Sequence, residues 1–185
     1  EYGEVVSFLT LLNKYSIAIY DKKNNSFSVK EPFNTGELIS QYYVNPSTPF
    51  SNIYNMRRVF RASEGNIYWI DKHFRKEGFE IIIDGLAYNG VKTVTIISGT
   101  DNCTPSAKAD YSALKAELYE RDIELTWRII SDVTFKWHDR WLVSDNSCYN
   151  IPPVLAIIRG QRSDIIRTQL MLDIQPFLDA STPIE

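Results

Sequence analysis

The stretch "KTVTIISGTDNCTPSAKADYSALKAELYERDIELTWRII", residues 92–130, decides the fold. Its first seven residues, 92–98, are rich in β-branched side chains and predict a buried strand. A polar loop follows, and residues 106–122 then begin with a serine cap and repeat apolar side chains at helical spacing. The closing segment, residues 123–130, predicts a second strand.

The same alternation of strands and helices continues on both sides of this stretch. Further strands are predicted by "NIYWI" (66–70), "FKWHDRWLVS" (135–144) and "PVLAIIRG" (153–160), and residues 71–88 predict a helix with a break near Gly78. Strands that alternate with helices of this length imply a mixed or parallel sheet. The sequence therefore predicts an α/β fold in which a mixed sheet is sandwiched by helices.

A smaller segment precedes this domain. Residues 4–13 predict a helix, and the following "SIAIYDKKNNSFSV" alternates around a polar turn and predicts a β-hairpin. The unit fits the tail of a winged-helix module, although lysines at the turn are equally expected on any solvated hairpin tip. A short helix is predicted over residues 35–44, and "NPSTP" after it is typical of a connector. We therefore expect a helix-hairpin segment over 1–48 and the main domain over 49–185.

Composition indicates a globular domain. The chain has 185 residues, of which 44% are hydrophobic, and its formal net charge is −3. So small a charge gives no long-range attraction to nucleic acid or to an anionic membrane, and any such binding must come from a local patch. No stretch has the length of a membrane span and none resembles an export signal, so the cytoplasm is the expected location. The start at Glu1, without methionine, suggests an excised piece of a longer protein.

The cysteines and the missing metal motifs restrict the chemistry. Cys103 and Cys148 lie far apart without CxxC spacing, which argues against a zinc site and against a disulfide framework. The sequence shows no glycine-rich phosphate loop, no HExxH motif and no cluster of metal ligands. We therefore expect neither a cofactor nor a metal.

The stretch "KWHDRWLVSD", residues 136–145, carries the residues that point to a function. Alternate side chains of a strand share one face, so His138 and Arg140 are expected to emerge on the same side and reach one phosphate together. A neutral imidazole nitrogen can attack phosphorus, and a guanidinium can hold two phosphate oxygens. Asp145, near the end of the strand, can orient the imidazole.

His138, Arg140 and Asp145 resemble the His-x-Lys-x-x-x-x-Asp signature of the phospholipase D superfamily, with arginine in place of lysine. The resemblance covers roughly residues 60–175. It implies a phospholipase D-like fold and a phosphodiesterase that needs no metal, in which His138 is the nucleophile or its acid partner. It also implies that Arg140 binds the phosphate and that Asp145 supports the histidine. The chain holds one motif copy where the complete family site uses two, which implies a homodimer.

The Gly-Ser-x-Asn element that follows the aspartate in active family members has only "RGQRSD" as its nearest equivalent here. Ser163 in that segment stands much further downstream than the family serine. Arg159, Arg162 and Ser163 are candidates for a phosphate-binding patch. Each of these residues also has a structural interpretation in place of phosphate binding. Arginines near a strand end usually form solvated ion pairs, and Ser163 can cap a helix that begins there. His138 also has a structural interpretation, as an imidazole packed between two tryptophans.

Two further clusters predict no chemistry. His73 and Arg75 fall in a segment predicted as helix, where residues two apart diverge, so they do not form a second motif copy. Arg57, Arg58 and Arg61 form a basic stripe beside an apolar one. Such a stripe can follow a nucleic-acid backbone, but charged outer faces of helices are ordinary, and the ordinary interpretation is favoured.

The favoured hypothesis is a phospholipase D-like nuclease that acts on DNA or RNA as a homodimer. In a bacterial setting such a domain often serves as the effector of an anti-phage or restriction protein. Two alternatives stay open. His-Asp-Arg followed by Asp-Asn is also similar to the C-terminal phospholipase D-like domain of MIT-domain proteins, which implies an inactive domain that binds phosphorylated ligands, membranes or a protein partner. The third hypothesis is a DNA-binding regulator with an upstream winged helix.

Overall fold

The computed structural model describes residues 18–21, 26–29, 40–87, 90–131 and 138–184. The chain divides into two compact units, Glu1–Glu37 and Leu38–Glu185. In the first unit, strands β1 (Ala18–Asp21) and β2 (Ser26–Val29) pair in antiparallel orientation, as the expected hairpin requires. The helix expected over residues 4–13 and the lysines of the hairpin turn lie outside the described residues.

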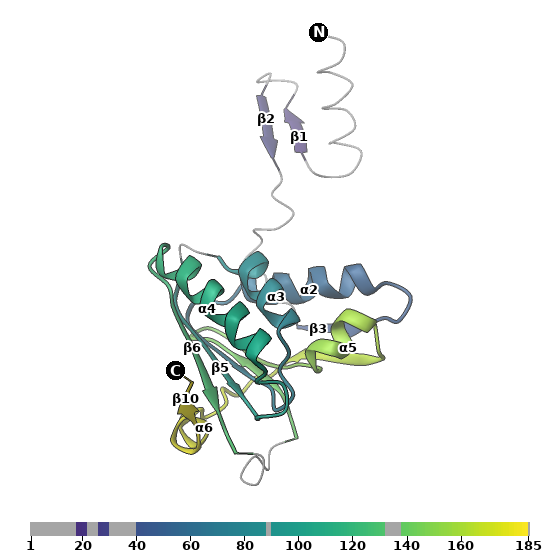
Figure 1. Cartoon of the computed structure of the whole chain (residues 1–185). Helices are drawn as coiled ribbons and strands as arrows, with labels where there is room; N and C mark the ends of the chain where they lie inside the picture. The colour runs from purple at the N-terminus through teal and green to yellow at the C-terminus, as the bar shows by residue number, and fades with distance from the viewer. Residues whose placement is uncertain (1–17, 22–25, 30–39, 88–89, 132–137, 185) are drawn as a thin grey trace. The chain divides into compact units, whose positions relative to one another are not determined.

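The second unit is built on one eight-stranded sheet (Figure 1). In spatial order the strands are β10 (Thr182–Pro183), β6 (Glu124–Ile129), β5 (Val91–Ser98), β4 (Gly65–Ile70), β7 (Trp141–Val143), β8 (Cys148–Asn150), β9 (Ser163–Arg167) and β3 (Gln41–Val44). The three strands β4, β5 and β6 are parallel, and every other neighbouring pair is antiparallel. The sheet is therefore mixed, as the alternation of strands and helices predicted.

The two faces of the sheet are covered differently. The described helices are α2 (Pro49–Arg61), α3 (Glu77–Gly85), α4 (Pro105–Tyr119), α5 (Val154–Arg159) and α6 (Gln175–Ala180). Helices α2 to α5 bury their apolar faces in the main core, and Figure 1 shows α2, α3 and α4 on the same side of the sheet. Alternate strand residues point to opposite faces, so Trp69 enters this core whereas Ile70 joins a smaller cluster with Phe177 of α6. None of the described helices is long and apolar enough to cross a bilayer.

Three element predictions are corrected by the structure. Residues 153–160 were expected as a strand but form helix α5, because a short apolar run does not distinguish a strand from a buried helix. The helix ends at Gly160, which adopts a left-handed conformation with φ of 64°. The expected helix over 35–44 is strand β3 from Gln41 onward. The segment from Ser163, for which a helix capped by that serine was the alternative interpretation, is strand β9, and these two strands pair with each other.

The pairing of β3 with β9 also bears on the boundary between the two units, which was expected after residue 48. Because β3 hydrogen-bonds to β9, Gln41–Val44 belongs to the main unit, and the chain divides after residue 37 instead of residue 48. Two other elements are shorter than expected. The helix predicted over 71–88 begins only at Glu77, and the strand predicted over 135–144 is restricted to Trp141–Val143 within the described residues.

Arg128 on β6 attaches the C-terminal segment to the sheet. Its guanidinium donates to the Ser181 hydroxyl at 2.8 Å, to the Ser181 carbonyl at 2.7 Å and to the Leu178 carbonyl at 3.1 Å. Two of these acceptors are backbone carbonyls at the end of α6, where the last carbonyls of a helix lack the regular partner of its interior. The same segment then continues as β10, whose Thr182 lies opposite Ile129 of β6.

We expect the Arg128→Met substitution to loosen this segment. It keeps most of the apolar stem but removes three charge-assisted hydrogen bonds, each of a class typically worth about 1.5–3 kcal/mol. Amide hydrogen exchange over residues 177–184 should accelerate, and the free energy of unfolding in urea should fall. Arg121→Met is the control, because its ion pair with Glu117 is exposed and such pairs contribute about 0–1 kcal/mol. Equal effects of the two substitutions would contradict the anchoring role.

Candidate functional site

The carboxyl ends of the parallel strands define the candidate site. Since β4 and β5 are parallel with Ile70 opposite Ile97, the segments that follow them leave the sheet at the same edge. Strand β7 is antiparallel to β4 with Trp141 opposite Ile70, so the residues before Trp141 reach this edge as well. We call residues 71–73, 99–102 and 138–140 the carboxyl edge. Ligand sites of open α/β sheets commonly lie at such edges.

Asp71 is the buried centre of this edge. Its side chain is fully buried, and one carboxylate oxygen, Oδ1, accepts from Arg140 Nε at 2.9 Å and from the His73 amide at 3.0 Å. Burial raises the pKa of the Asp71 carboxyl above its ordinary value, and the charge of Arg140 acts against that rise. The amide of Val154, at the start of α5, also lowers this pKa. Asp71 therefore joins the segment after β4 to the segment before β7.

His138 and Arg140 both lie at this edge, but in different environments. Both precede β7, so their expected placement on a strand is not what positions them. His138 is exposed, whereas 23% of the Arg140 side chain is accessible and its Nη1 donates to the His138 carbonyl at 3.4 Å. The guanidinium is thus held by Asp71 with part of its surface still open, so it can present a positive charge beside His138.

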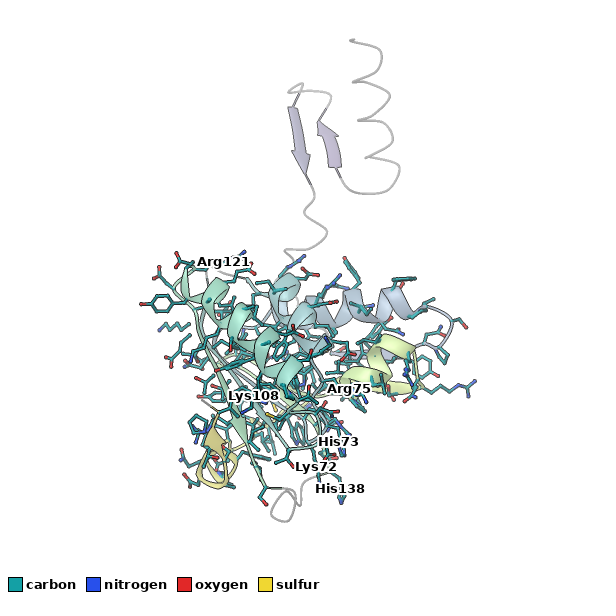
Figure 2. The ribbon with its side chains drawn as sticks, viewed as in Figure 1. Lys72, His73, Arg75, Lys108, Arg121 and His138 are labelled. Carbon is teal, nitrogen blue, oxygen red and sulfur yellow. The ribbon has the colours of Figure 1, made fainter. Side chains whose placement is uncertain are left out.

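His73 lies at the same edge and was missed because the sequence predicted a helix around it. The helix starts only at Glu77, so His73 occupies a loop. Its Nδ1 lies 2.8 Å from Asp101 Oδ2, and both side chains are about half exposed. Figure 2 shows Lys72, His73 and His138 at the same end of the unit. The available signal was that polar "DKH" and "GTD" segments directly follow two predicted parallel strands.

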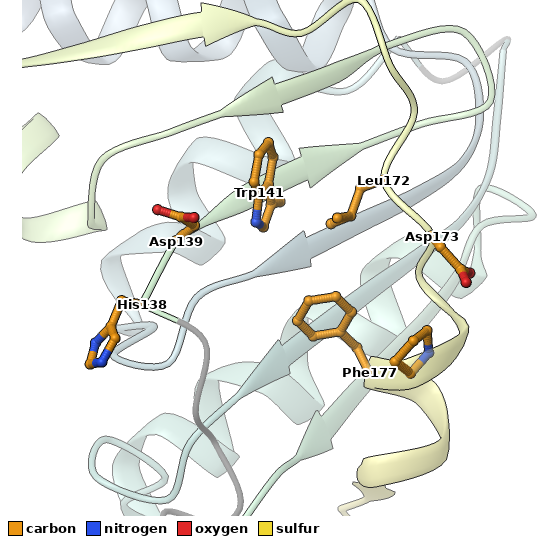
Figure 3. A pocket seen from close by; sticks show the side chains of 7 residues that line it. His138, Asp139, Trp141, Leu172, Asp173 and Phe177 are labelled. Carbon is orange, nitrogen blue, oxygen red and sulfur yellow. The ribbon is translucent and has the colours of Figure 1, made fainter.

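A shallow pocket of about 330 Å³ adjoins His138 (Figure 3). His138 and Asp139 form one end of it, and the side chains of Trp141, Leu172 and Phe177 line its apolar part. An aromatic surface beside an exposed imidazole can accept a planar group, such as a nucleobase, next to a phosphate. The pocket lies on the face of the sheet that carries α6.

Asp145 does not lie beside His138, in contrast to the expected supporting role. The two residues flank opposite ends of β7. The Asp145 carboxylate accepts from Asn66 Nδ2 at 3.3 Å, and its amide donates to the Glu64 carbonyl at 3.1 Å, which places it at the beginning of β4. An extended strand advances about 3.3 Å per residue, so the motif spacing itself separates the aspartate from the histidine. The contacts of Asp145 are structural.

Arg159 and Arg162 precede β9, which begins at Ser163 and is two strands away from β7 in the sheet. Ser163 opens β9 opposite Val44 of β3, and its hydroxyl donates to the Gln161 carbonyl at 3.0 Å. Arg159 ends α5, and both arginines are exposed. The structure gives these three residues no described contact with the carboxyl edge, so a phosphate-binding role for them stays a prediction. The alternative of Ser163 as a helix cap does not hold, because the segment that it opens is a strand.

The basic stripe of α2 packs against α3. Arg57 forms an ion pair with the Asp84 carboxylate, and Arg61 donates to the Asp84 carbonyl at 3.2 Å. Arg58 is half-buried. The ordinary interpretation of this stripe therefore fits the structure. The two cysteines are free thiols, of which Cys148 is buried.

No protein-family model matches the chain, and no curated protein matches it. Among solved structures, the chain is similar to NucT from Helicobacter pylori, with a TM-score of 0.50 and 10% identity over 78% of this chain and 98% of NucT. It is also similar to TrmBL2, an archaeal chromatin protein, with a TM-score of 0.47 and 13% identity over 100% of this chain and 84% of TrmBL2. NucT is a phospholipase D-family nuclease, so its match supports a phospholipase D-like fold.

This likeness shows the fold alone, because one fold hosts many chemistries. It agrees with the mixed α/β architecture expected from the sequence. The catalytic roles of His138 and Arg140 come from their own geometry and remain proposals.

The raised pKa of Asp71 predicts a pH-dependent stability. The folded state binds the Asp71 proton more tightly than the unfolded state does, so the stabilisation from this proton is complete below the ordinary pKa of 3.8 and is lost as the pH rises through the raised value. We therefore expect the stability of the native protein, relative to Asp71→Asn, to decrease as the pH rises above 3.8 and through the raised pKa of Asp71. Urea unfolding of both proteins across this range measures the difference. A difference that is constant with pH would contradict the assignment.

Gly65 should not tolerate alanine. Its φ is 69°, and a Cβ at this position would overlap the Asp145 carboxylate. The backbone conformation alone should lower the free energy of unfolding by about 1–2 kcal/mol. Adding Asp145→Ala should relieve the overlap but leave this backbone contribution. Gly90→Ala is the matched control, since its Cβ would meet its nearest atom at 3.7 Å. Urea denaturation should give a near-neutral result for Gly90→Ala only.

Proposed function

We propose that this chain is a phospholipase D-like phosphodiesterase that cleaves nucleic acid without a metal. The observation that carries the proposal is the placement of an exposed His138 next to Arg140 at the carboxyl edge of a phospholipase D-like sheet. Nucleic acid is favoured as the substrate because Trp141 and Phe177 line a pocket beside His138, where a base can stack.

His138 would act as the nucleophile. The lone pair of an imidazole nitrogen attacks phosphorus, and the bond from phosphorus to the leaving oxygen breaks. Arg140 would stabilise the charge that develops on the non-bridging oxygens, because it is fixed in advance by Asp71 Oδ1 at 2.9 Å. Water then hydrolyses the phosphohistidine and restores His138. Asp145 has no part in these steps, since it hydrogen-bonds to Asn66 at the other end of β7.

The leaving oxygen needs a proton. Because His138 acts as the nucleophile, a second acid–base group must donate that proton. In a homodimer in which two copies of His138 face each other, the partner copy would supply this proton. Sedimentation across a range of protein concentrations tests it. If activity per chain falls as the dimer dissociates, the partner copy contributes to the site.

We expect His138→Ala to abolish cleavage of single-stranded DNA and of bis-p-nitrophenyl phosphate in the presence of EDTA. Removing a nucleophile that forms a covalent intermediate typically costs about a thousandfold or more in rate. Because His138 is exposed, the variant should fold normally, as urea unfolding can verify. Arg121→Ala is the control with unchanged activity, since Figure 2 shows Arg121 at the opposite end of the unit.

Two results would overturn this function. One is a wild-type protein that is inert toward both substrates at high concentration. The other is a His138→Ala variant with full activity. An inert protein that binds phosphorylated ligands would favour a non-catalytic role of the same edge.

A further inference from the structure

We propose that His73, held by Asp101, is the second acid–base group of this site and that it acts within one chain. The proposal rests on the proposed phosphodiesterase function and deepens it by assigning the proton transfer. The structure offers His73 as a group for this role without a partner copy.

Three hydrogen bonds fix His73 at the carboxyl edge. Its amide donates to Asp71 Oδ1 at 3.0 Å, its carbonyl accepts from Asn102 Nδ2 at 3.2 Å, and its Nδ1 lies 2.8 Å from Asp101 Oδ2. The neighbouring Lys72 carbonyl accepts from the Gly99 amide at 2.9 Å. The loops after β4 and β5 are therefore joined around this histidine, which limits the positions that its ring can adopt.

The buried side chain next to His73 provides a second anchor. Phe74 is 1% exposed and packs edge-on against Trp69 with ring centroids 5.1 Å apart. It also meets Phe79 at 5.4 Å, and Gly78 leaves the space that its ring occupies. Because Phe74 points into the core, the preceding His73 side chain is directed away from it, and 48% of that side chain is accessible.

One carboxylate oxygen connects His73 to the proposed nucleophile. Asp71 Oδ1 accepts both the His73 amide and Arg140 Nε, and Arg140 in turn donates to the carbonyl of His138. The two histidines thus belong to segments that share one buried acceptor. Figure 2 shows both of them at the same end of the unit.

The contact with Asp101 selects the useful tautomer. When Nδ1 carries a proton and donates it to the Asp101 carboxylate, Nε2 is the nitrogen left for exchange with a ligand. A carboxylate that holds the ring in this way also fixes its orientation, as in hydrolytic triads. His73 is therefore oriented to give a proton from Nε2 and to accept one there later.

The reaction balances with these two histidines. A His138 nitrogen attacks phosphorus, the P–O bond to the leaving group breaks, and protonated His73 gives its Nε2 proton to the departing oxygen. Neutral His73 then accepts a proton from the water that attacks phosphorus, and the P–N bond breaks to restore His138. The net result is hydrolysis of one phosphodiester by one water.

The test compares two leaving groups in His73→Gln. Cleavage of DNA expels an alkoxide that needs a proton, whereas bis-p-nitrophenyl phosphate expels a phenolate that is stable without one. General acid catalysis contributes about 10²–10⁴-fold, so single-stranded DNA cleavage should fall by about 100-fold. The release of p-nitrophenolate in a single turnover, with enzyme in excess, should be nearly unchanged. Asp101→Asn should give a smaller loss with the same selectivity for DNA.

The outcomes separate this proposal from the function on which it rests. A wild type that cleaves neither substrate removes the function itself. If the wild type is active but His73→Gln slows both substrates equally, or neither, His73 is not the acid and this inference fails alone. A loss of DNA cleavage that follows dimer dissociation instead of the His73 substitution would assign the proton to the partner copy and also overturn it. His138→Ala should abolish the single-turnover release that His73→Gln retains.

Discussion

The organisation of this edge depends on the buried carboxylate of Asp71. It is fully buried, so its charge is costly unless it is compensated, and Arg140 and the His73 amide meet on the same oxygen to compensate it. Removing one partner of such a buried pair generally leaves an uncompensated charge and is strongly destabilising. This requirement holds the segment before β7 against the segment after β4. His73 and His138 are exposed residues of these two segments, so the contacts of Asp71 also determine where both histidines lie.

The asymmetry of the sheet explains why this edge is accessible. The main core on the face of α2 to α5 contains most of the buried aromatic residues of the described chain, and it fixes the loop after β4 through Phe74. The opposite face is covered by a smaller cluster around Phe177, beside which the pocket next to His138 lies open. A rigid, densely packed side therefore supports a site whose other side is solvent-accessible. Such support is what preorganised polar groups need, because their geometry must not depend on the ligand.

The three residues of the motif lie in two different places in the fold. His138 and Arg140 lie at the carboxyl edge, whereas Asp145 lies at the amino end of β4. There its carboxylate occupies the space beside Gly65, which is why that residue has no side chain. A fixed spacing in the sequence thus combines two residues at the carboxyl edge with an aspartate at the opposite end of β7. The linear pattern alone makes no distinction between them.

The sequence by itself determined the strand–helix–strand unit and the mixed α/β architecture, because β-branched runs and helical periodicity are local signals. It also singled out His138 and Arg140, whose catalytic roles stay proposals. Short segments were ambiguous: α5 resembled a strand, and β3 resembled a helix, since a few apolar residues fit either pattern. Only the tertiary structure brought His73 and Asp101 together, because this contact joins two loops 28 residues apart. Parallel pairing of β4 and β5 decides which loops meet, and that pairing is a non-local property of the sheet.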